Sequence, residues 1–410
     1  MTQRTSVEQP DDSGMLGGPV NSVNFDLSDE HQALLNQITR SARARFGALG
    51  DRMDREAWWP ENGFRMLADL GVLGASVPRT YGGQGLDLFS AGLLGQALGR
   101  VEPSIATSWQ SHDNLCVNNI YRNGSEYLRR NYLPGLCEGS LVGALGMTEP
   151  NAGSDALGGM RTTAVRDGGD YRLNGSKIFI TNGPIADVVL VYAKTAPERG
   201  NRGISAFVVE KSFSGFRAGP KFDKMGIRGS PTGELFFDDC RVPVRNMIGP
   251  EHGGVGVMMS GLDIERGFCS MSVIGATERA FDLALDYAKT RQQFGQAIGS
   301  FQMIQSKLAE MYVQLESMKV LAYRALAACN GLEGGQGGRG DIHALTAAAF
   351  MIVGENGMKI CDEAVQIHGG MGFMRETEVN RIYRAAKIHE IGGGTKEIRR
   401  MIIAKELLKR

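Results

Sequence analysis

The sequence predicts an α+β protein in which two helical parts flank a central β region. Apolar residues recur at three- and four-residue intervals from about Leu27 to Gly139, and again from Gly253 onward, which is the period of amphipathic helices. Between them, from Leu141 to Val242, the apolar runs are short, rich in β-branched and aromatic residues, and bounded by glycines. We therefore expect a disordered tail over residues 1–23, and domains over residues 24–140, 141–248 and 249–410.

Composition limits the class of partner. The 45 basic and 45 acidic side chains cancel, so the chain as a whole has no electrostatic attraction to nucleic acid or to an anionic membrane. No apolar run approaches the roughly 18–20 residues that cross a bilayer. We therefore expect no nucleic-acid partner and no membrane partner, and a phosphorylated ligand would need a local cluster of Lys and Arg.

The cysteines and the first residues bear on the cellular compartment. The six cysteines are scattered, with no CxxC pair and no neighbouring pair of histidines, so disulfides and a zinc site are not expected. The first 20 or so residues have neither the apolar core of a secretory signal nor the arginines of a transit peptide. We predict reduced, buried thiols, no bound metal and a cytoplasmic location.

The central region is predicted to form an antiparallel barrel or sandwich. The runs 171–173 and 177–181 flank Asn174 and Gly175, a dipeptide typical of a type I′ hairpin turn. Further strands are expected over residues 188–192, 204–209 and 234–238.

The C-terminal helices are expected to pack against the N-terminal ones, with the β domain to one side. Residues 280–289 and 304–313 are amphipathic, whereas residues 345–353 are almost uniformly apolar and should be deeply buried. The segment from Gly335 to Gly340 matches GxGxxG, but it lies between two helical stretches rather than after a strand. We therefore interpret it as a flexible helix–helix connector and not as a dinucleotide site.

Glu265 is the best candidate for a catalytic base. The 11 residues that follow Arg266, Gly267 to Thr277, contain no charge and predict a helix buried on all sides. A carboxylate at the mouth of such a helix loses solvation, which raises its pKa toward neutrality and suits it to general-base catalysis. From these residues alone, an ion pair with Arg266 or with a lysine elsewhere is the favoured interpretation.

The stretch Met147 to Asp155 is the most distinctive loop. Backbone N–H groups around Asn151, Gly153 and Ser154 could wrap an anion or a planar heterocycle, although a simple turn between strands would also fit. Together with residues 177–183, 291–295 and 367–373, it resembles the acyl-CoA dehydrogenase superfamily, flavoenzymes that desaturate thioesters. The resemblance begins near Asn24 and implies a helical N-terminal domain, a middle antiparallel β-barrel, a C-terminal four-helix bundle, bound FAD and a homotetramer.

The resemblance also implies where the base lies. Most of the superfamily carries its glutamate in a Tyr-Glu-Gly-Thr loop near the C-terminus, but here that loop is Glu390 to Thr395 and Gly393 takes the glutamate's position. The isovaleryl-CoA dehydrogenase branch instead carries its glutamate on an internal helix, in a motif nearly identical to residues 261–266. Glu265 is then the base that removes the α-proton while hydride passes to flavin N5, and the N–H of Gly393 binds the thioester oxygen.

By the same resemblance, three sets of residues would bind ligands. The isoalloxazine would be held by Leu145, Met147, Thr148, Gly153, Ser154, Phe179, Ile180 and Thr181. From a neighbouring subunit, Arg291, Gln302, Gln366, Gly369 and Gly370 would hold the adenosine and pyrophosphate, and Thr395 and Glu397 would meet the cofactor where the last helix opens. The substrate would meet Ser154, Asp263, Arg266, Cys269, Gly392 and Gly394. From sequence alone Arg291 fits a solvated helix end equally well, and we interpret His368 as a buried, hydrogen-bonded histidine.

Small residues and departures from the family pattern bear on the substrate. Gly392 stands where straight-chain enzymes have tyrosine, and Cys269 where the isovaleryl branch has leucine, so a branched acyl pocket is expected. At Gly256, at Phe179 and in the run 108–110, this sequence has residues that differ from those of the isovaleryl branch at the same positions, which weakens the assignment of isovaleryl-CoA itself. The sequence therefore implies an isovaleryl-like acyl-CoA, reoxidation by an electron-transfer flavoprotein and, as an alternative, an acyl or prolyl group on a carrier protein. A helical scaffold without catalysis is the third interpretation.

Overall fold

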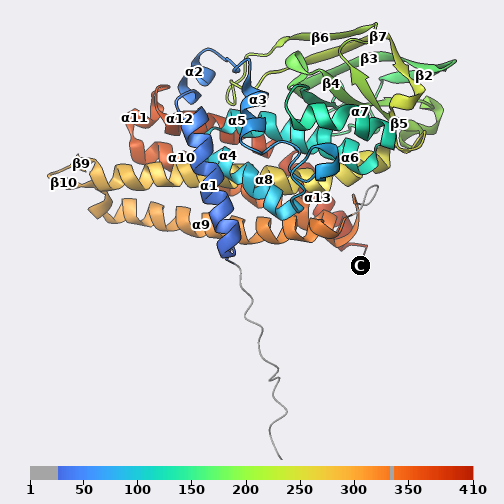
Figure 1. Cartoon of the computed structure of the whole chain (residues 1–410). Helices are drawn as coiled ribbons and strands as arrows, with labels where there is room; N and C mark the ends of the chain where they lie inside the picture. Colours follow the sequence, from blue (N-terminus) through green and yellow to red (C-terminus); the bar gives the residue numbers. More distant parts are fainter. Residues whose placement is uncertain (1–25, 333–336, 410) are drawn as a thin grey trace, which may run out of the picture.

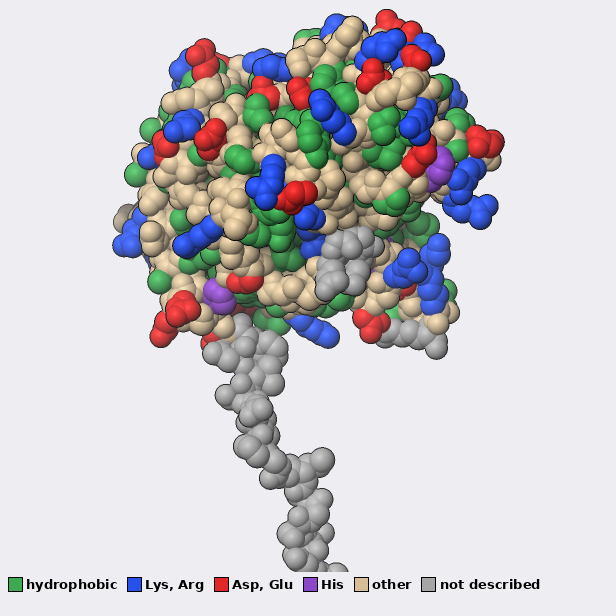
Figure 2. Space-filling view, turned by 45° about the vertical axis from the view of Figure 1, so that its right-hand side comes forward, with side chains coloured by type: hydrophobic (Ala, Val, Ile, Leu, Met, Phe, Trp, Pro, Cys, Tyr) green, Lys and Arg blue, Asp and Glu red, His purple; other side chains and the backbone are tan. Residues whose placement is uncertain are grey.

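The computed structural model describes residues 26–332 and 337–409, and it confirms the predicted α+β organisation. A single large sheet lies over one end of a layered array of helices (Figure 1). The expected tail over residues 1–23 and the first two residues of the GxGxxG match, 335 and 336, lie outside the described residues. On the face shown in Figure 2, basic and acidic side chains are interspersed, as the balanced composition predicts.

The N-terminal part is helical, and its longer helices begin at side-chain caps. Ser28 accepts a hydrogen bond from the N–H of His31 at the start of α1, and Asp87 does the same for two N–H groups of α4. A π-helical turn, Ser111–Asn118, follows α5 directly. The helices are α1 (Asp29–Phe46), α2 (Gly50–Arg55), α3 (Gly63–Asp69), α4 (Leu88–Val101), α5 (Pro103–Gln110), α6 (Asn119–Asn123) and α7 (Glu126–Cys137).

The middle region forms one eight-stranded sheet, in the order β6-β7-β3-β2-β4-β5-β8, with β1 paired to β4. Most pairs are antiparallel, but β4 pairs in parallel with both β1 and β2, so the purely antiparallel expectation was wrong. Within the described residues no strand pairing joins β6 and β8, the ends of this path. The strands are β1 (Gly143–Gly146), β2 (Thr163–Asp167), β3 (Asp170–Thr181), β4 (Val188–Lys194), β5 (Ile204–Glu210), β6 (Phe216–Lys221), β7 (Thr232–Pro243) and β8 (Met247–Ile248).

The hairpin predicted at Asn174 and Gly175 was also wrong. β3 runs straight through this dipeptide, and the chain turns earlier, between β2 and β3, where Asp167 pairs with Asp170. The dipeptide instead lies at a register shift against β7. A Cβ on Gly175 would lie 2.6 Å from Oγ1 of Thr162, so the glycine permits a close backbone approach and not a turn.

The C-terminal part is built around α8, a helix of 37 residues that packs against α4, α9 and α10. The two helical parts therefore form one assembly, as expected. Glycines bring α4 and α8 together: a Cβ on Gly99 would lie 2.0 Å from the carbonyl oxygen of Ser272, and one on Gly275 would lie 1.9 Å from that of Gln96. The elements are α8 (Gly254–Thr290), β9 (Gln292–Gln293), β10 (Gln296–Ala297), α9 (Gln302–Ala328), α10 (Gly340–His368), α11 (Gly370–Phe373), α12 (Glu378–Ala386) and α13 (Lys396–Leu407).

The cysteines, the glycine-rich segment and His368 can also be compared with the expectations. All six cysteines are buried and unpaired. The glycine-rich segment joins α9 to α10, and His368 is partly buried, with Nδ1 2.7 Å from the carbonyl oxygen of Ala364. Among the helices of the described residues, none combines the length and the apolar character needed to cross a membrane.

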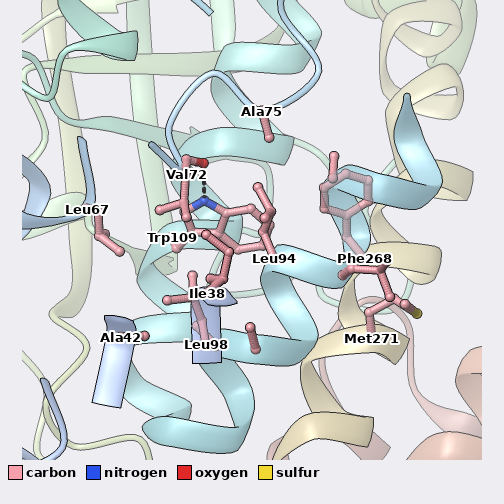
Figure 3. Packing of buried hydrophobic residues seen from close by; sticks show 14 of the residues in the cluster. Ile38, Ala42, Leu67, Val72, Ala75, Leu94, Leu98, Trp109, Phe268 and Met271 are labelled. Carbon is pink, nitrogen blue, oxygen red and sulfur yellow. Dashed lines mark hydrogen bonds between the residues drawn. The ribbon is translucent and has the colours of Figure 1, made fainter. Parts of the chain in front are cut away.

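Trp109 fixes α5 against α8. Its indole N–H donates to the carbonyl of Val72 at 2.8 Å, and its ring stacks on Phe268 at 5.9 Å between centroids (Figure 3). Both rings lie in the large N-terminal core cluster, to which α8 also contributes Ile264 and Met271. This contact sets how the end of α5 meets the middle of α8.

Trp109→Phe should therefore destabilise the protein more than a tryptophan change at the surface. The variant leaves the buried Val72 carbonyl without its donor and removes part of a packed ring, which together should lower the free energy of unfolding by about 2–4 kcal/mol. Urea denaturation would measure this, with Trp58→Phe, a partly exposed position, as the matched control. Equal losses in the two variants would contradict the assigned role.

Candidate functional site

The site is centred on Glu265, in the first third of α8. Its side chain is 9% exposed, and burial raises its pKa to about 7, although the positive charges of Arg266 and Arg399 counteract part of that shift. Among the described residues no ion pair involves Glu265, so the salt-bridge interpretation is not what the structure shows. A buried carboxylate with a near-neutral pKa is suited to accept a proton.

The loop before α13 lies directly beside this carboxylate. Gly393 has a φ of 65°, and a Cβ built on it would lie 3.7 Å from Oε1 of Glu265 and 2.8 Å from the ring of Phe350. The main chain of the loop therefore approaches Glu265 as closely as it does only because residue 393 has no side chain. The predicted base and the predicted main-chain donor are brought together.

Arg399 holds this loop, and sequence reasoning did not identify it. Its side chain is fully buried and donates to the carbonyls of His389 at 2.8 Å, Phe350 at 3.2 Å and Gly392 at 2.5 Å. The guanidinium also stacks over the Phe350 ring at 3.7 Å. Burial lowers the pKa of Arg399 to about 10, so it stays charged at neutral pH. The sequence offers one signal for a buried arginine here: Ile402 and Ile403, three and four residues later, place Arg399 beside apolar residues on one face of α13.

Arg266 is held away from Glu265 by a second buried cluster. The carboxylate of Asp263 lies 3.2 Å from Nη1 of Arg266 and 2.6 Å from Nδ1 of His343, and it accepts the N–H of Gly338 at 2.7 Å. Burial would raise the pKa of Asp263, but hydrogen bonding and the charge of its partners lower it overall. Both carboxylate oxygens of Asp263 have protein partners, and through one of them Asp263 orients Arg266. The expected direct contact of Asp263 with a ligand stays a prediction.

Cys269 lies one helical turn after Glu265 and is buried, which raises the pKa of its thiol to about 12. The expected gain of pocket volume at Cys269 needs correction, because the carboxamide of Gln110 lies against the sulfur and Nε2 donates to it. Gly392, by contrast, has room: a Cβ there would find its nearest neighbour, the carbonyl oxygen of Ile388, at 3.5 Å.

A buried ion pair fixes the loop after β1. Nζ of Lys177 lies 2.8 Å from Oε1 of Glu149, and Glu149 also accepts the N–H groups of Arg161 at 2.6 Å and Thr162 at 3.0 Å. Neither Glu149 nor Lys177 was singled out in the sequence for this role. Nothing lies within 4 Å of a Cβ built on Gly153, so the main chain there is open to a ligand, as predicted.

Phe179 extends this open surface. It has a φ of 61° and lies at a register shift between β3 and β7. The residue is 65% exposed, and one side of its ring contacts the ring of Phe222. Ile180, in contrast, is buried in the sheet core, so only its main chain is available to a ligand. An exposed aromatic ring beside open main chain fits a planar, polar cofactor.

The remaining cofactor candidates gather at the far end of the helices. Arg291 ends α8, Gln302 begins α9 and Gln366 is near the end of α10, and the stack of Tyr287 on His368, 4.4 Å between centroids, joins these ends. At 1.5 Å per residue, Arg291 lies about 39 Å along α8 from Glu265. The residues around Glu265 and the residues around Arg291 of one chain therefore cannot belong to one site. This distance is consistent with the expectation that Arg291 and its neighbours bind the cofactor of a neighbouring subunit. That contribution stays a prediction.

The last helix opens where expected. Thr395 caps α13, accepting the N–H of Ile398 at 3.3 Å, and Glu397 is exposed in the first turn. First-turn amides at a helix start are suited to bind anionic or polar groups. A contact between Thr395 or Glu397 and a cofactor stays a prediction.

The raised pKa of Glu265 predicts how stability depends on pH. The carboxyl ionises near 4.5 when unfolded and near 7 when folded, so the unfolded state loses its proton first as pH rises. The free energy of unfolding from this group therefore falls between those two pH values. Glu265→Gln lacks this titration, so its melting temperature relative to wild type should rise from about pH 5 to about pH 8. A flat difference, like that expected for the surface control Glu61→Gln, would contradict the raised pKa.

Comparisons with known proteins agree with this geometry. Three family models match: the acyl-CoA dehydrogenase N-terminal domain over residues 28–140, the middle domain over residues 144–240 and the C-terminal domain over residues 252–408. An isovaleryl-CoA dehydrogenase of Solanum tuberosum is 38% identical over 95% of this chain and 93% of its own length. A 2-methylacyl-CoA dehydrogenase of the same plant is 37% identical, with 95% and 93% covered.

Solved structures share the fold over nearly the whole chain. Butyryl-CoA dehydrogenase from Megasphaera elsdenii aligns with a TM-score of 0.89 and 36% identity, covering 94% of this chain and 100% of that one. A prolyl acyl carrier protein oxidase aligns at 0.87 and 31%, covering 93% and 100%. A glutaryl-CoA dehydrogenase from Mycobacterium smegmatis in complex with FADH2 aligns at 0.87 and 28%, covering 94% and 96%. The chain belongs to the acyl-CoA dehydrogenase family of flavoprotein oxidoreductases.

Proposed function

We propose that this protein catalyses the FAD-dependent α,β-dehydrogenation of a short branched-chain acyl-CoA, similar to isovaleryl-CoA, with Glu265 as the base. The observation that carries the proposal is the position of Glu265: a buried, unpaired carboxylate with a pKa of about 7, beside the main chain of Gly393. Catalysis of this reaction needs one carboxylate above the α-carbon and a hydrogen-bond donor at the thioester oxygen.

Glu265 removes the α-proton of the bound thioester. Because that proton is only weakly acidic, negative charge that develops on the thioester oxygen has to be stabilised. The N–H of Gly393 donates to this oxygen, a type of interaction worth about 3–4 kcal/mol in the transition state. Arg399 contributes by holding the loop in position through Gly392 and by adding positive charge behind it.

The residues fit an isoalloxazine ring at the face of the β domain. The exposed ring of Phe179, the open main chain at Gly153 and the polar segment from Met147 to Ser154 would hold it. When bound, FAD supplies the acceptor for the hydride that leaves the β-carbon. Arg291, Gln302 and the segment from Gln366 to Gly370 would hold the adenosine and pyrophosphate of a neighbouring subunit's cofactor, which makes a homotetramer part of the proposal.

Two observations support a branched acyl group. Gly392 leaves space where a larger side chain could stand, and two of the relatives reported above, the isovaleryl-CoA and 2-methylacyl-CoA dehydrogenases, are named for branched acyl groups. We also propose reoxidation by an electron-transfer flavoprotein and a cytoplasmic location, which the family resemblance and the sequence favour.

A carrier-bound acyl or prolyl thioester is the second candidate. It is favoured by the similarity to a prolyl acyl carrier protein oxidase and by Gly256, near the start of α8, where nothing lies within 4 Å of a built Cβ. Anaerobic bleaching of the flavin by isovaleryl-CoA, compared with bleaching by acyl-carrier thioesters, separates the two. A colourless protein without flavin absorbance would favour the scaffold interpretation and overturn both.

Glu265→Gln should retain FAD but reduce it at least about 10²-fold more slowly than wild type, because the amide cannot accept the α-proton. Stopped-flow absorbance at saturating isovaleryl-CoA would measure the rate. Glu61→Gln, which makes the same change at an exposed position away from the site, serves as the comparison. Near-normal reduction by Glu265→Gln would refute the assignment of the base.

Gly392→Tyr should shift the preference from branched toward straight chains, because the ring fills the space beside the acyl group. The backbone at Gly392 has no positive φ, so a side chain there adds no backbone strain. The ratio of kcat/KM for isovaleryl-CoA to that for butyryl-CoA should fall by about 10-fold or more. An unchanged ratio would count against the pocket argument.

A further inference from the structure

Gln110, the last residue of α5, reaches across to α8 beside the base. It is 7% exposed, and its Nε2 donates to the sulfur of Cys269. The preceding residue, Trp109, stacks on Phe268, which precedes Cys269 (Figure 3). Two consecutive side chains of α5 thus contact two consecutive side chains of α8, and this packing fixes where the Gln110 carboxamide lies.

The contact lies on the face of α8 that carries the base. Cys269 follows Glu265 by four residues, so the two side chains share one face and are separated along the axis by about 6 Å. The charge of Glu265 also contributes to the raised pKa of the Cys269 thiol, which confirms their proximity. An acyl chain with its α-carbon at Glu265 that extended along this face of α8 would meet Cys269 and Gln110 at its distal end.

The chemistry of this pair is unusual for a pocket that takes only hydrocarbon. A carboxamide has two N–H donors and an oxygen that accepts two hydrogen bonds, whereas a neutral thiol is a weak partner. Among the described residues, the sulfur of Cys269 is the one partner of the Gln110 carboxamide. A purely aliphatic acyl group packed against it would leave buried polar atoms unsatisfied, which disfavours binding.

The pair also selects against charge. Among the described residues, Gln110 forms no contact with a cation, and Arg399 on this side is already committed to three carbonyl oxygens. A carboxylate on the acyl chain would lie near Glu265, and the two arginines that act on this place, Arg266 and Arg399, are already hydrogen-bonded to Asp263 and to carbonyl oxygens. A neutral group that donates or accepts a hydrogen bond satisfies the carboxamide without this penalty.

We propose that Gln110, presented against Cys269, is a specificity-determining residue that selects acyl groups carrying a neutral hydrogen-bonding substituent, such as a hydroxyl or an N–H, at their distal end. The inference rests on the proposed dehydrogenase function and names the substrate class of that same site.

Two thioesters that differ by one hydroxyl test the inference: isovaleryl-CoA and 4-hydroxy-3-methylbutyryl-CoA. Anaerobic flavin reduction by the holoenzyme gives kcat/KM for each. The wild type should prefer the hydroxylated thioester by at least about 10-fold, and Gln110→Met, which keeps the length but removes the amide, should lose that preference. Gln96→Met is the matched control, since Gln96 is buried on α4 and bonded to Glu278 and Tyr323, away from Cys269.

Binding supplies a second measurement that does not require turnover. Calorimetric Kd values for the same two thioesters, measured on Glu265→Gln holoenzyme with and without Gln110→Met, should show the same change of ratio. If Gln110→Met does not fold, Gln110→Asn, which withdraws the amide, should weaken the preference in the same direction. Equal preference in the wild type, or a preference unchanged by Gln110 substitution, overturns the inference. Failure of every thioester to bleach the flavin overturns the proposed function instead, and the Kd ratios still decide the role of Gln110.

Discussion

The site depends on a buried carboxylate that two nearby arginines influence but do not neutralise by contact. Arg266 is committed to Asp263, and Arg399 is committed to carbonyl oxygens, so neither forms an ion pair with Glu265. Their charges lower the pKa of Glu265 from the value that burial alone would give, yet it remains near 7. If either arginine paired directly with Glu265, the carboxylate would be a weak base at neutral pH. The hydrogen bonds that restrain the arginines are therefore as important to the site as the glutamate itself.

Those restraints depend on the packing of long helices. Glycines at 99 and 275 let α4 and α8 approach until backbone meets backbone, and the Trp109–Phe268 stack sets the end of α5 against α8. Because α8 is continuous through the site, Glu265 and Cys269 keep a fixed separation of one helical turn. The β domain adds an independent restraint, the buried Glu149–Lys177 pair, at the loop that faces the cofactor.

The sequence was sufficient for features with a local signal. Helical periods, the uncharged run after Arg266 and the polar loop at Met147 are all local patterns, and the helices, the buried Glu265 and the open loop agree with them. Features that depend on contacts between distant segments were missed or misread. Arg399 and Gln110 act only through partners that α10, the loop before α13 and α8 bring to them. Asn174-Gly175 has a strong turn propensity, but pairing with β7 and the close approach of Thr162 override it.

The position of the base on α8 explains why the C-terminal loop is a run of glycines. Residue 393 has a positive φ, and a side chain there would begin 2.8 Å from the Phe350 ring and 3.7 Å from Oε1 of Glu265. A glutamate at 393 would therefore strain the backbone, displace Phe350 from beneath Arg399, and put a second carboxylate against the first. Two carboxylates in one buried site raise each other's pKa, so at neutral pH at least one would be protonated and unable to act as a base. A glutamate at 393 and the proposed base Glu265 therefore exclude each other on physical grounds, and the proposed base position on α8 requires a glycine at 393.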